Sequence, residues 1–213
     1  MKLYGYWRSS ATWRVRIALN FKDIPYGYIP VHLVRDGGEQ LKDWYQTLNP
    51  SQQVPTLEVE LDGSTRHLGQ SMAILEFLEE FKAAPAMLPK DLYLRSRTRQ
   101  LAEIVNSGIQ PHQNLSVLNH LKALKVDSNA WSRKWISQGL VAFQTVVEET
   151  AGTFSVGDSP TWADACLIPQ LYNARRFSID LKPFERLVEI ESVCAELECF
   201  KKAHADAQPD AQP

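Results

Sequence analysis

The sequence has few cysteines, no strong excess of either charge and no long apolar run. Its 213 residues include three cysteines, at positions 166, 194 and 199, and carry a formal net charge of −2. The odd, unpaired cysteine set argues against a disulfide framework and against a zinc site, so we expect no bound metal. The near-neutral charge gives no electrostatic basis for binding nucleic acid or an anionic membrane.

Membrane and secretion signals are also lacking. No apolar segment approaches the roughly 20 residues that a membrane-spanning helix requires. Residues 2–6 already have a strand pattern, which leaves no room for a signal peptide. Hydrophobic residues make up 44% of the chain, enough for one large domain or two small ones. The sequence therefore predicts a soluble cytoplasmic protein.

Residues 1–84 alternate between strand and helix patterns. Strands are expected at 3–6, 26–34 and 56–61, and helices at 10–21, 40–46 and 71–80. Asp62-Gly63 marks a hairpin turn after the third strand. Strand–helix–strand followed by a hairpin and a helix is the order of an α/β unit of thioredoxin type.

The second part of the chain has a different character. Two prolines in residues 85–89 break helices on both sides and indicate a linker. Helix patterns follow at 93–109, 115–125, 129–150, 162–177 and 184–203. We therefore predict a thioredoxin-like domain over 1–84, an all-α domain over 90–204 and a flexible Ala, Asp, Gln and Pro tail over 205–213.

Three short segments are candidates for a binding site. Arg8-Ser9-Ser10 joins the first strand to the first helix, and Gln70-Ser71 opens the third helix. A helix N-terminus stabilises an anion, including a thiolate, although serine is also favoured there as a plain helix cap. Val54-Pro55, before the third strand, is a candidate cis peptide whose backbone could pair with an extended peptide; an ordinary trans edge proline is the alternative.

The segment Arg8-Ser9-Ser10-Ala11-Thr12-Trp13-Arg14-Val15-Arg16-Ile17-Ala18-Leu19 resembles the fingerprint S-S-C-x-W-R-V-R-I-A-L of the zeta-class glutathione transferases. Further matching segments follow in the family's order at residues 32–38, 48–50, 53–57, 70–74, 108–118 and 173–177. The resemblance implies a glutathione transferase fold, glutathione as cofactor and a homodimer. The family comprises maleylacetoacetate and maleylpyruvate isomerases.

The resemblance also implies roles for individual residues. Ser9, with Ser10 beside it, would donate a hydrogen bond from its hydroxyl to the glutathione sulfur. Arg8 would stabilise the negative charge that develops during the reaction. The remaining cofactor contacts would come from Gln53, Val54, Pro55, Gln70 and Ser71. The substrate carboxylates would be held by Arg8 and Arg176, with Gln110 nearby and His112 lining the cavity. An arginine fork suits a planar carboxylate because it donates two parallel hydrogen bonds.

One position departs from the family pattern. The fingerprint cysteine is Ala11 here, so catalysis cannot depend on a protein thiol at that position. Thr12 could supply an extra hydroxyl, or its side chain could point away. Farther along the chain, Thr161 and Asp164 have the spacing of a capping box, which indicates a role in folding.

The implied activity is glutathione-dependent cis–trans isomerisation of maleylacetoacetate or maleylpyruvate to the fumaryl form, in the catabolism of aromatic compounds. Residues 113–116 favour maleylacetoacetate of the two. Conjugation of glutathione to α-haloacids or other small electrophiles is an alternative, because the same thiolate serves both reactions. A non-catalytic glutathione-binding dimer is a second alternative, which Ala11 supports.

Overall fold

The computed structural model describes residues 1–212, which form two compact units. Residues 1–86 and the segment from Leu197 onward make up the first unit, and Met87–Glu196 make up the second. The first unit contains a mixed sheet with helices, and the second contains helices. The predicted fold class, a thioredoxin-like α/β part followed by an all-α part, is confirmed.

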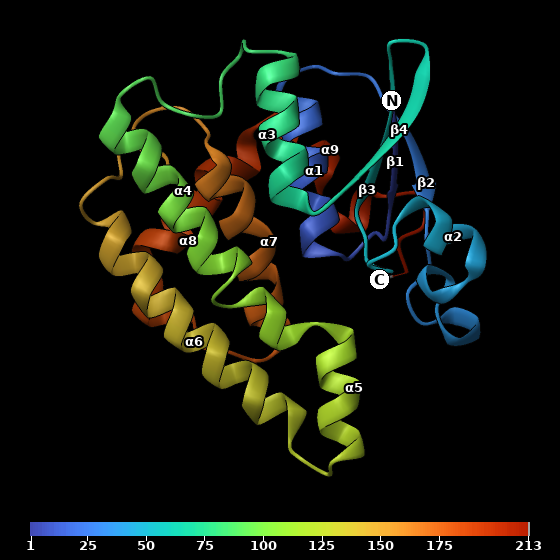
Figure 1. Ribbon diagram of the computed structural model, residues 1–213. Helices are drawn as coiled ribbons and strands as arrows, with labels where there is room; N and C mark the ends of the chain where they lie inside the picture. Colours follow the sequence, from blue (N-terminus) through green and yellow to red (C-terminus); the bar gives the residue numbers. More distant parts are fainter. Residues whose placement is uncertain (213) are drawn as a thin grey trace. The chain divides into compact units, whose positions relative to one another are not determined.

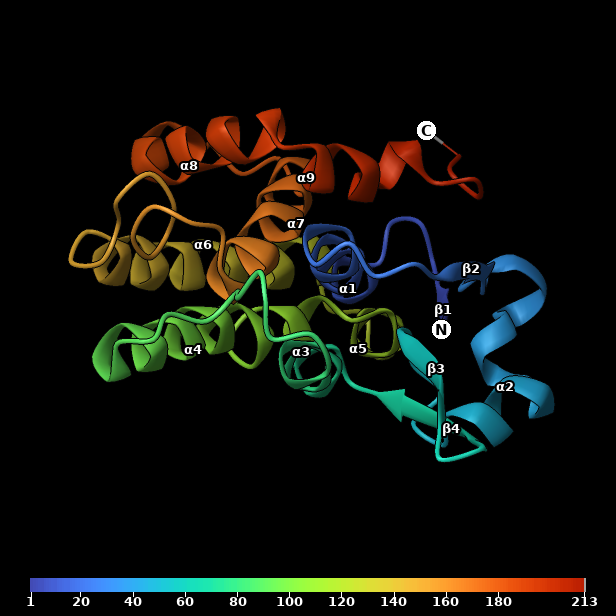
Figure 2. The same cartoon turned by 90° about the horizontal axis from the view of Figure 1, so that it is seen from above.

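The first unit is built on a four-stranded sheet with the order β2-β1-β3-β4. Its strands are β1 (Lys2–Gly5), β2 (Gly27–Pro30), β3 (Thr56–Leu61) and β4 (Ser64–Gly69). Strand β2 runs parallel to β1, whereas β3 is antiparallel to both β1 and β4. Helices α1 (Ser10–Phe21) and α3 (Ser71–Phe81) cover one face of the sheet, and α2 (Asp43–Leu48) lies on the other (Figures 1 and 2).

Apolar side chains from the sheet and from α1 and α3 form the core of this unit. Leu3, Val15, Leu57, Ile74 and Leu78 are fully buried. Strand β2 is shorter than the predicted strand at 26–34, because it pairs only with the four residues of β1, from Gly27 opposite Lys2 to Pro30 opposite Gly5. The predicted helix at 40–46 is divided between the 3₁₀ turn Glu39–Leu41 and α2.

The C-terminal segment differs from its prediction. In place of one helix over 184–203, the chain forms α8 (Glu185–Glu196) and then α9 (Glu198–Ala203), which packs against α1. The following residues are held by hydrogen bonds: the Gln208 side-chain amide donates to Lys202 O (2.9 Å) and His204 O (2.7 Å). Residues of the expected flexible tail over 205–213 thus make hydrogen bonds within the first unit; Pro213 lies outside the described residues.

Glu58 on β3 collects three hydrogen bonds from neighbouring side chains. It accepts from Lys2 Nζ (2.8 Å), Tyr4 OH (2.7 Å) and His67 Nε2 (3.3 Å). These donors, chiefly Lys2, lower the pKa of Glu58 to about 2. The carboxylate therefore ties β1 and β4 to β3 in its ionised form.

We expect this group to make the protein less stable in acid. The pKa of Glu58 is lower in the folded than in the unfolded chain, so its contribution is complete above the unfolded value of about 4.3. The contribution is lost as the pH falls towards about 2. Urea unfolding between pH 6 and 2 should show that Glu58→Gln lacks roughly 1 kcal/mol of this pH dependence. Glu60→Gln on the same strand is the control, and an identical pH dependence in the two variants would contradict the assignment.

The second unit consists of α4 (Leu92–Asn106), α5 (Leu115–Ala123), α6 (Ser128–Val147), α7 (Trp162–Arg176) and α8, with the 3₁₀ turns η3 (Gln110–Gln113) and η4 (Lys182–Phe184). Helix α4 packs against α6 and α7, and α7 packs against α8. Leu101, Leu140, Phe143, Leu171 and Ile190 are fully buried in this unit. Among residues 1–212, no helix combines the length and the apolar character needed to cross a membrane.

The start of α7 contains the predicted capping interaction. The Asp164 carboxylate accepts from Thr161 N (2.7 Å) and Thr161 Oγ1 (2.9 Å), and also from Ser155 N (2.8 Å). Asp164 is fully buried, and burial raises its pKa while these hydrogen bonds oppose the shift. The side chain therefore joins the loop before α7 to the first turn of the helix.

Asp164→Ala should destabilise the protein by roughly 2–4 kcal/mol, because two buried backbone N–H groups lose their acceptor. Asp158→Ala is the matched control: Asp158 also accepts two hydrogen bonds, both from Thr153, but its side chain is exposed. Denaturant unfolding should show a much smaller loss for the control. Equal losses would contradict the role given to Asp164.

Candidate functional site

Strand register brings the three predicted binding segments to one end of the sheet. Tyr4 of β1 pairs with Thr56 of β3, and Thr56 pairs with Gly69 of β4. The end of β1, the start of β3 and the end of β4 therefore lie side by side, about 5 Å apart between neighbouring strands. Residues 8–10 follow β1, residues 53–55 precede β3 and residues 70–71 follow β4. All the residues predicted to contact the cofactor thus lie at this one end of the sheet in the first unit.

Ser9 caps helix α1 with its side chain. Its Oγ accepts a hydrogen bond from Thr12 N (3.2 Å). A serine hydroxyl has one proton to donate and two lone pairs, so this cap leaves the proton available for another acceptor. Ser10 begins the helix, where the unpaired N–H groups and the dipole favour an anion. This end of α1 can therefore stabilise a thiolate through both a hydroxyl and the helix terminus.

Thr12 does not take part in this site. Its side chain is fully buried. It packs under the end of β1, where a Cβ on Gly5 would lie 2.2 Å from Thr12 Cγ2. The hydroxyl therefore belongs to the core of the first unit. Of the three hydroxyls considered from the sequence, Ser9 and Ser10 remain as candidates.

The loop between β1 and α1 also positions Arg8. The Trp7 indole is buried at 3% exposure, and the Arg8 guanidinium lies 5.1 Å from the ring centroid. Such cation–π stacking restrains the guanidinium without consuming its hydrogen-bond donors. Arg8 is half-buried, so those donors are partly open to solvent.

Residues 49–56 form a tightly held loop before β3. The Gln53 carbonyl accepts from Tyr45 OH (2.7 Å) and Asn49 Nδ2 (2.8 Å). Burial raises the pKa of Tyr45 to about 12, which keeps its hydroxyl protonated as a donor. The Val54–Pro55 peptide is cis, as the sequence suggested it could be. Within residues 1–212 the backbone of Val54 has no hydrogen-bond partner, so it is available to an extended peptide.

Helix α3 provides a second anion site. Gln70, at its N-cap position, is exposed and has a φ of 66°. Ser71 is buried at 4% exposure, and its Oγ accepts from Arg14 Nη1 (3.1 Å). The buried guanidinium of Arg14 therefore adds positive charge beside the N-terminus of α3. This environment suits a carboxylate.

Arg14 is a charged residue next to the candidate site that sequence reasoning missed. Its position four residues after Ser10 places both on the same face of α1, and this spacing could have identified it. Arg16, the other arginine of the fingerprint, is fully buried and donates to Ala203 O (3.0 Å) and Trp7 O (2.8 Å). The two arginines thus hold the framework of the first unit.

The other predicted substrate contacts belong to the second unit. Gln110 and His112 lie in η3, and Arg176 is the last residue of α7. The His112 ring stacks on Trp135 with 4.0 Å between centroids. Trp131 Nε1 donates to the His112 carbonyl (3.1 Å). The two tryptophans are half-buried and pack around His112.

The two adjacent arginines at the end of α7 have different partners. Arg175 forms a two-pronged ion pair with Glu191 of α8, with one bond of 2.6 Å. Arg176 is exposed and donates to Asn173 Oδ1 (3.2 Å). The Arg175 guanidinium is thus engaged by a carboxylate of the protein, and Arg176 is the arginine that the family resemblance assigns to a substrate carboxylate.

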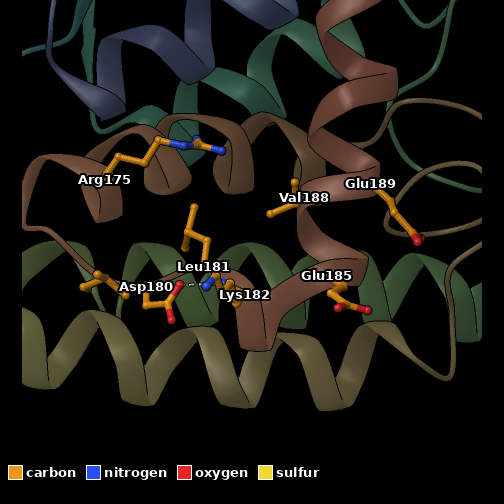
Figure 3. Close-up of a pocket in the computed structure, with 8 residues that line it drawn as sticks. Arg175, Asp180, Leu181, Lys182, Glu185, Val188 and Glu189 are labelled. Atoms are coloured by element: carbon orange, nitrogen blue, oxygen red, sulfur yellow. Dashed lines mark hydrogen bonds between the residues drawn. The ribbon is translucent and has the colours of Figure 1, made fainter.

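A cavity of about 670 Å³ lies elsewhere in the second unit, between the end of α7 and the start of α8 (Figure 3). Charged side chains of both signs surround it, including Arg175, Asp180, Lys182, Glu185 and Glu189. None of the predicted site residues lines it. We therefore do not assign it to the predicted chemistry.

None of the three cysteines belongs to the three segments at the end of the sheet described above. Cys166 is in α7, Cys194 is in α8 and both are buried. Cys199, in α9, is half-buried, and burial raises the pKa of its thiol. A cysteine in such surroundings is a poor nucleophile. A thiolate at the start of α1 must therefore come from a bound ligand.

Comparison with known proteins agrees with this geometry. Residues 8–80 match the N-terminal domain of glutathione S-transferases. The chain is 45% identical to the maleylacetoacetate isomerase of Rattus norvegicus over 98% of this chain and 94% of the relative. A bacterial maleylpyruvate isomerase, solved in its holo form as a zeta-class glutathione S-transferase, superposes with a TM-score of 0.93 at 44% identity, over 100% of both chains.

A further relative was solved with ligands in its active site. The maleylacetoacetate isomerase of Anaeromyxobacter dehalogenans 2CP-1 contains dicarboxyethyl glutathione and citrate. Its TM-score to this chain is 0.90 at 49% identity, over 100% of this chain and 97% of that one. These matches extend over both units at identities well above those that show only a shared fold. The chain belongs to the zeta-class glutathione S-transferase family, together with the maleylacetoacetate and maleylpyruvate isomerases.

Proposed function

We propose that this protein is a glutathione-dependent cis–trans isomerase that converts a maleyl keto-dicarboxylate, maleylacetoacetate or maleylpyruvate, to its fumaryl form. The observation that carries the proposal is the arrangement at the end of the sheet. The N-termini of α1, with Ser9 and Ser10, and of α3 lie together there. Beside them is the backbone of Val54, which has no hydrogen-bond partner within residues 1–212. A relative with 49% identity holds dicarboxyethyl glutathione in its active site, a thioether between glutathione and a four-carbon dicarboxylate.

The residues at this edge fit the chemical groups of glutathione. Gln70, Ser71 and the end of α3 would hold the γ-glutamyl carboxylate and amine. The Val54 backbone would pair with the cysteinyl unit in the manner of an added strand, with Gln53 and Pro55 setting its position. When bound, glutathione supplies a thiolate that adds to the activated double bond, allows rotation about the resulting single bond and is then eliminated.

Ser9 and Arg8 would perform the chemical work of the protein at this site. The Ser9 hydroxyl, which only accepts a hydrogen bond in its contact with Thr12 N, would donate a hydrogen bond to the sulfur and so favour the thiolate. Ser10 and the N-terminus of α1 would add to this effect. Arg8, stacked on Trp7, would bind a substrate carboxylate and stabilise the enolate as negative charge develops.

Three residues of the second unit complete the proposed substrate contacts. Arg176 would bind the other carboxylate, with Gln110 and His112 as further contacts. Support comes from their chemistry: a guanidinium can bind a planar carboxylate through two parallel hydrogen bonds, and the His112 ring is fixed against Trp135. Arg176→Gln should raise KM for the substrate more than it lowers kcat if the arginine binds substrate and transition state equally.

Conjugation is the second candidate function. The dicarboxyethyl glutathione in the Anaeromyxobacter relative is itself a conjugate, which shows that the active site of that protein accommodates one. The site described here gives a thiolate the same environment in both reactions. The non-catalytic alternative is less favoured, because the Ser9 proton and the stacked Arg8 have no evident role in binding alone.

Turnover assays on purified protein test these alternatives. With glutathione present, maleylacetoacetate and maleylpyruvate are supplied in parallel, isomerisation is followed by absorbance and products are analysed by mass spectrometry. We expect fumaryl product without glutathione attached, with the higher kcat/KM for maleylacetoacetate. Product that retains glutathione would favour conjugation, and no reaction with either substrate or with a haloacid would favour the non-catalytic alternative.

We further propose that the protein is a cytoplasmic homodimer. Family membership supports this assembly, as do exposed apolar side chains at the start of α4, where Leu92 is 79% and Tyr93 61% exposed. Sedimentation equilibrium should give twice the chain mass of 24.2 kDa. A single-chain mass at micromolar concentration would contradict the proposal.

A further inference from the structure

The peptide group on each side of Trp7 is held by a charged side chain. Trp7 N donates to Asp210 Oδ2 (3.0 Å), and Trp7 O accepts from Arg16 Nη2 (2.8 Å). Asp210 lies 203 residues farther along the chain, in the segment that the sequence predicted to be a flexible tail. Trp7, which immediately precedes Arg8 and Ser9, is therefore held by a residue near the C-terminal end of the chain.

Asp210 is itself held in place by the first unit. Tyr28 OH donates to the same carboxylate oxygen (3.3 Å), and Arg16 also binds Ala203 O at the end of α9 (3.0 Å). Burial lowers the pKa of Arg16, and the negative charge of Asp210 is one of the effects that oppose this shift. Burial also raises the pKa of Tyr28, with a further contribution from Asp210. Arg16, Tyr28 and Asp210 form one connected group, which we call the Asp210 clamp.

The clamp acts on the residues that carry the proposed chemistry. The Trp7 ring is buried at 3% exposure and supports the Arg8 guanidinium, and Ser9 N donates to Tyr6 O (3.0 Å) in the same loop. If Asp210 lost its carboxylate, the Trp7 N–H would be left without its acceptor, and the loop would shift to find another. Catalytic geometry is sensitive to such shifts, since a displacement of about 1 Å can lower a rate by about 10²-fold.

We propose that Asp210 is a positioning residue for the glutathione site. By fixing the Trp7 peptide, it sets the positions of Arg8 and Ser9. The C-terminal segment is thereby part of the structure that activates the thiol. This inference rests on the proposed function for its effect on turnover. Its effect on the loop itself does not depend on that function. In the part of the chain that the structure describes, residues 1–212, the groups proposed to hold the rest of glutathione, at Val54 and Gln70-Ser71, make no hydrogen bond to the clamp.

The test compares Asp210→Ala and Asp210→Asn with Glu198→Gln, which removes an exposed carboxylate from α9 in the same segment. Amide hydrogen exchange at Trp7 is measured in the free protein, and the pKa of the bound glutathione thiol is measured from thiolate absorbance without substrate. We expect Asp210→Ala to speed Trp7 exchange at least about 10-fold and to raise the thiol pKa. We also expect kcat to fall by about 10-fold or more, while the glutathione Kd changes by less than about 3-fold.

Asp210→Asn should show the same changes to a smaller degree, since its amide oxygen can still accept from Trp7 N, and Glu198→Gln should match the wild type. Wild-type values of Trp7 exchange and thiol pKa in Asp210→Ala would overturn the proposal. Parallel losses of thermal stability, glutathione affinity and kcat would also overturn it, because they indicate a general structural role. If Asp210→Ala does not fold, Asp210→Asn decides on the same criteria. If the wild type fails to isomerise either substrate, the function is wrong, and Trp7 exchange and the thiol pKa still test the clamp.

Discussion

Replacing Ser9 with alanine is expected to lower kcat by about 10²–10³-fold, the usual effect of removing one hydrogen-bond donor from a developing or stabilised anion. The physical reason is the free hydroxyl proton: Ser9 Oγ accepts from Thr12 N at 3.2 Å and still has its own proton to donate to the sulfur. Without that donor, a smaller fraction of bound glutathione is ionised at neutral pH. Glutathione affinity should change by less than about 3-fold, because the proposed contacts to the rest of the molecule, at Val54 and the N-terminus of α3, are unaltered.

Two further variants separate the hydroxyl from the helix cap. Ser9→Thr keeps a hydroxyl that can both cap and donate, and it should retain most of the activity. Ser10→Ala removes the neighbouring hydroxyl, which lies at the first helical position, and should have a smaller effect than Ser9→Ala. Steady-state kinetics and thiolate absorbance are measured for all three variants. A Ser10→Ala variant that loses more activity than Ser9→Ala would transfer the donor role to Ser10.

Replacing Arg8 with glutamine is expected to lower kcat/KM by about 10²-fold. The guanidinium would lose its charge-assisted hydrogen bonds to a substrate carboxylate and to the enolate, interactions of about 2–3 kcal/mol at a partly buried site. Arg8→Lys should recover only part of this loss, because an ammonium group does not provide the planar fork and stacks less well on Trp7.

Arg66→Gln on β4 is the control for the loss of one positive charge, since Arg66 is exposed and precedes the end of the strand near the site. It should stay within about 2-fold of the wild type, as expected for an exposed charge screened by salt. Kinetics at two ionic strengths distinguish direct contact from long-range attraction. If Arg8→Gln and Arg66→Gln lose activity equally, Arg8 acts only through the net charge.

Much of the fold could be predicted from local pattern. The apolar spacing of residues 10–21 and 71–80 is helical, and each segment follows a strand, so the order of elements in the first unit was readable. The break between α8 and α9 at Leu197 could not be predicted, because the helical spacing of apolar residues continues through both helices. What separates them is packing of α9 on α1, including the bond from Arg16 to Ala203 O. Such a contact between residues 187 positions apart leaves no local signal.

The C-terminal tail shows the same limit of sequence reasoning. Its Ala, Asp, Gln and Pro composition is typical of a disordered segment. Its order comes from long-range hydrogen bonds, of which those to Trp7 and Tyr28 involve a single carboxylate, Asp210. Amino-acid composition predicts the average tendency of a segment, and a specific hydrogen-bond acceptor such as Asp210 can override that tendency.

In the candidate site, the sequence could predict which segments follow or precede a strand. It could not predict the direction in which their side chains point. The placement of Ser9 and Gln70-Ser71 at helix N-termini at one end of the sheet could be predicted from the order of strands and helices, and such termini suit anions. The direction of Thr12 stayed open in the sequence, and the structure places it in the core under Gly5. Arg14 carries a charge that suggested no partner until the structure showed Ser71 at 3.1 Å. Which hydroxyl faces a ligand depends on helix rotation, which packing determines.

We propose that the reactive sulfur belongs to glutathione and returns unchanged after each turnover, because position 11 is an alanine, Cys166 and Cys194 are buried and burial raises the pKa of Cys199. The most direct measurement is proton NMR of the isomerisation with glutathione at one-tenth of the substrate concentration. The account predicts full conversion to the fumaryl form, complete recovery of free glutathione and no conversion when glutathione is omitted. Conversion without glutathione, or conversion that stops once the glutathione is consumed, would contradict it.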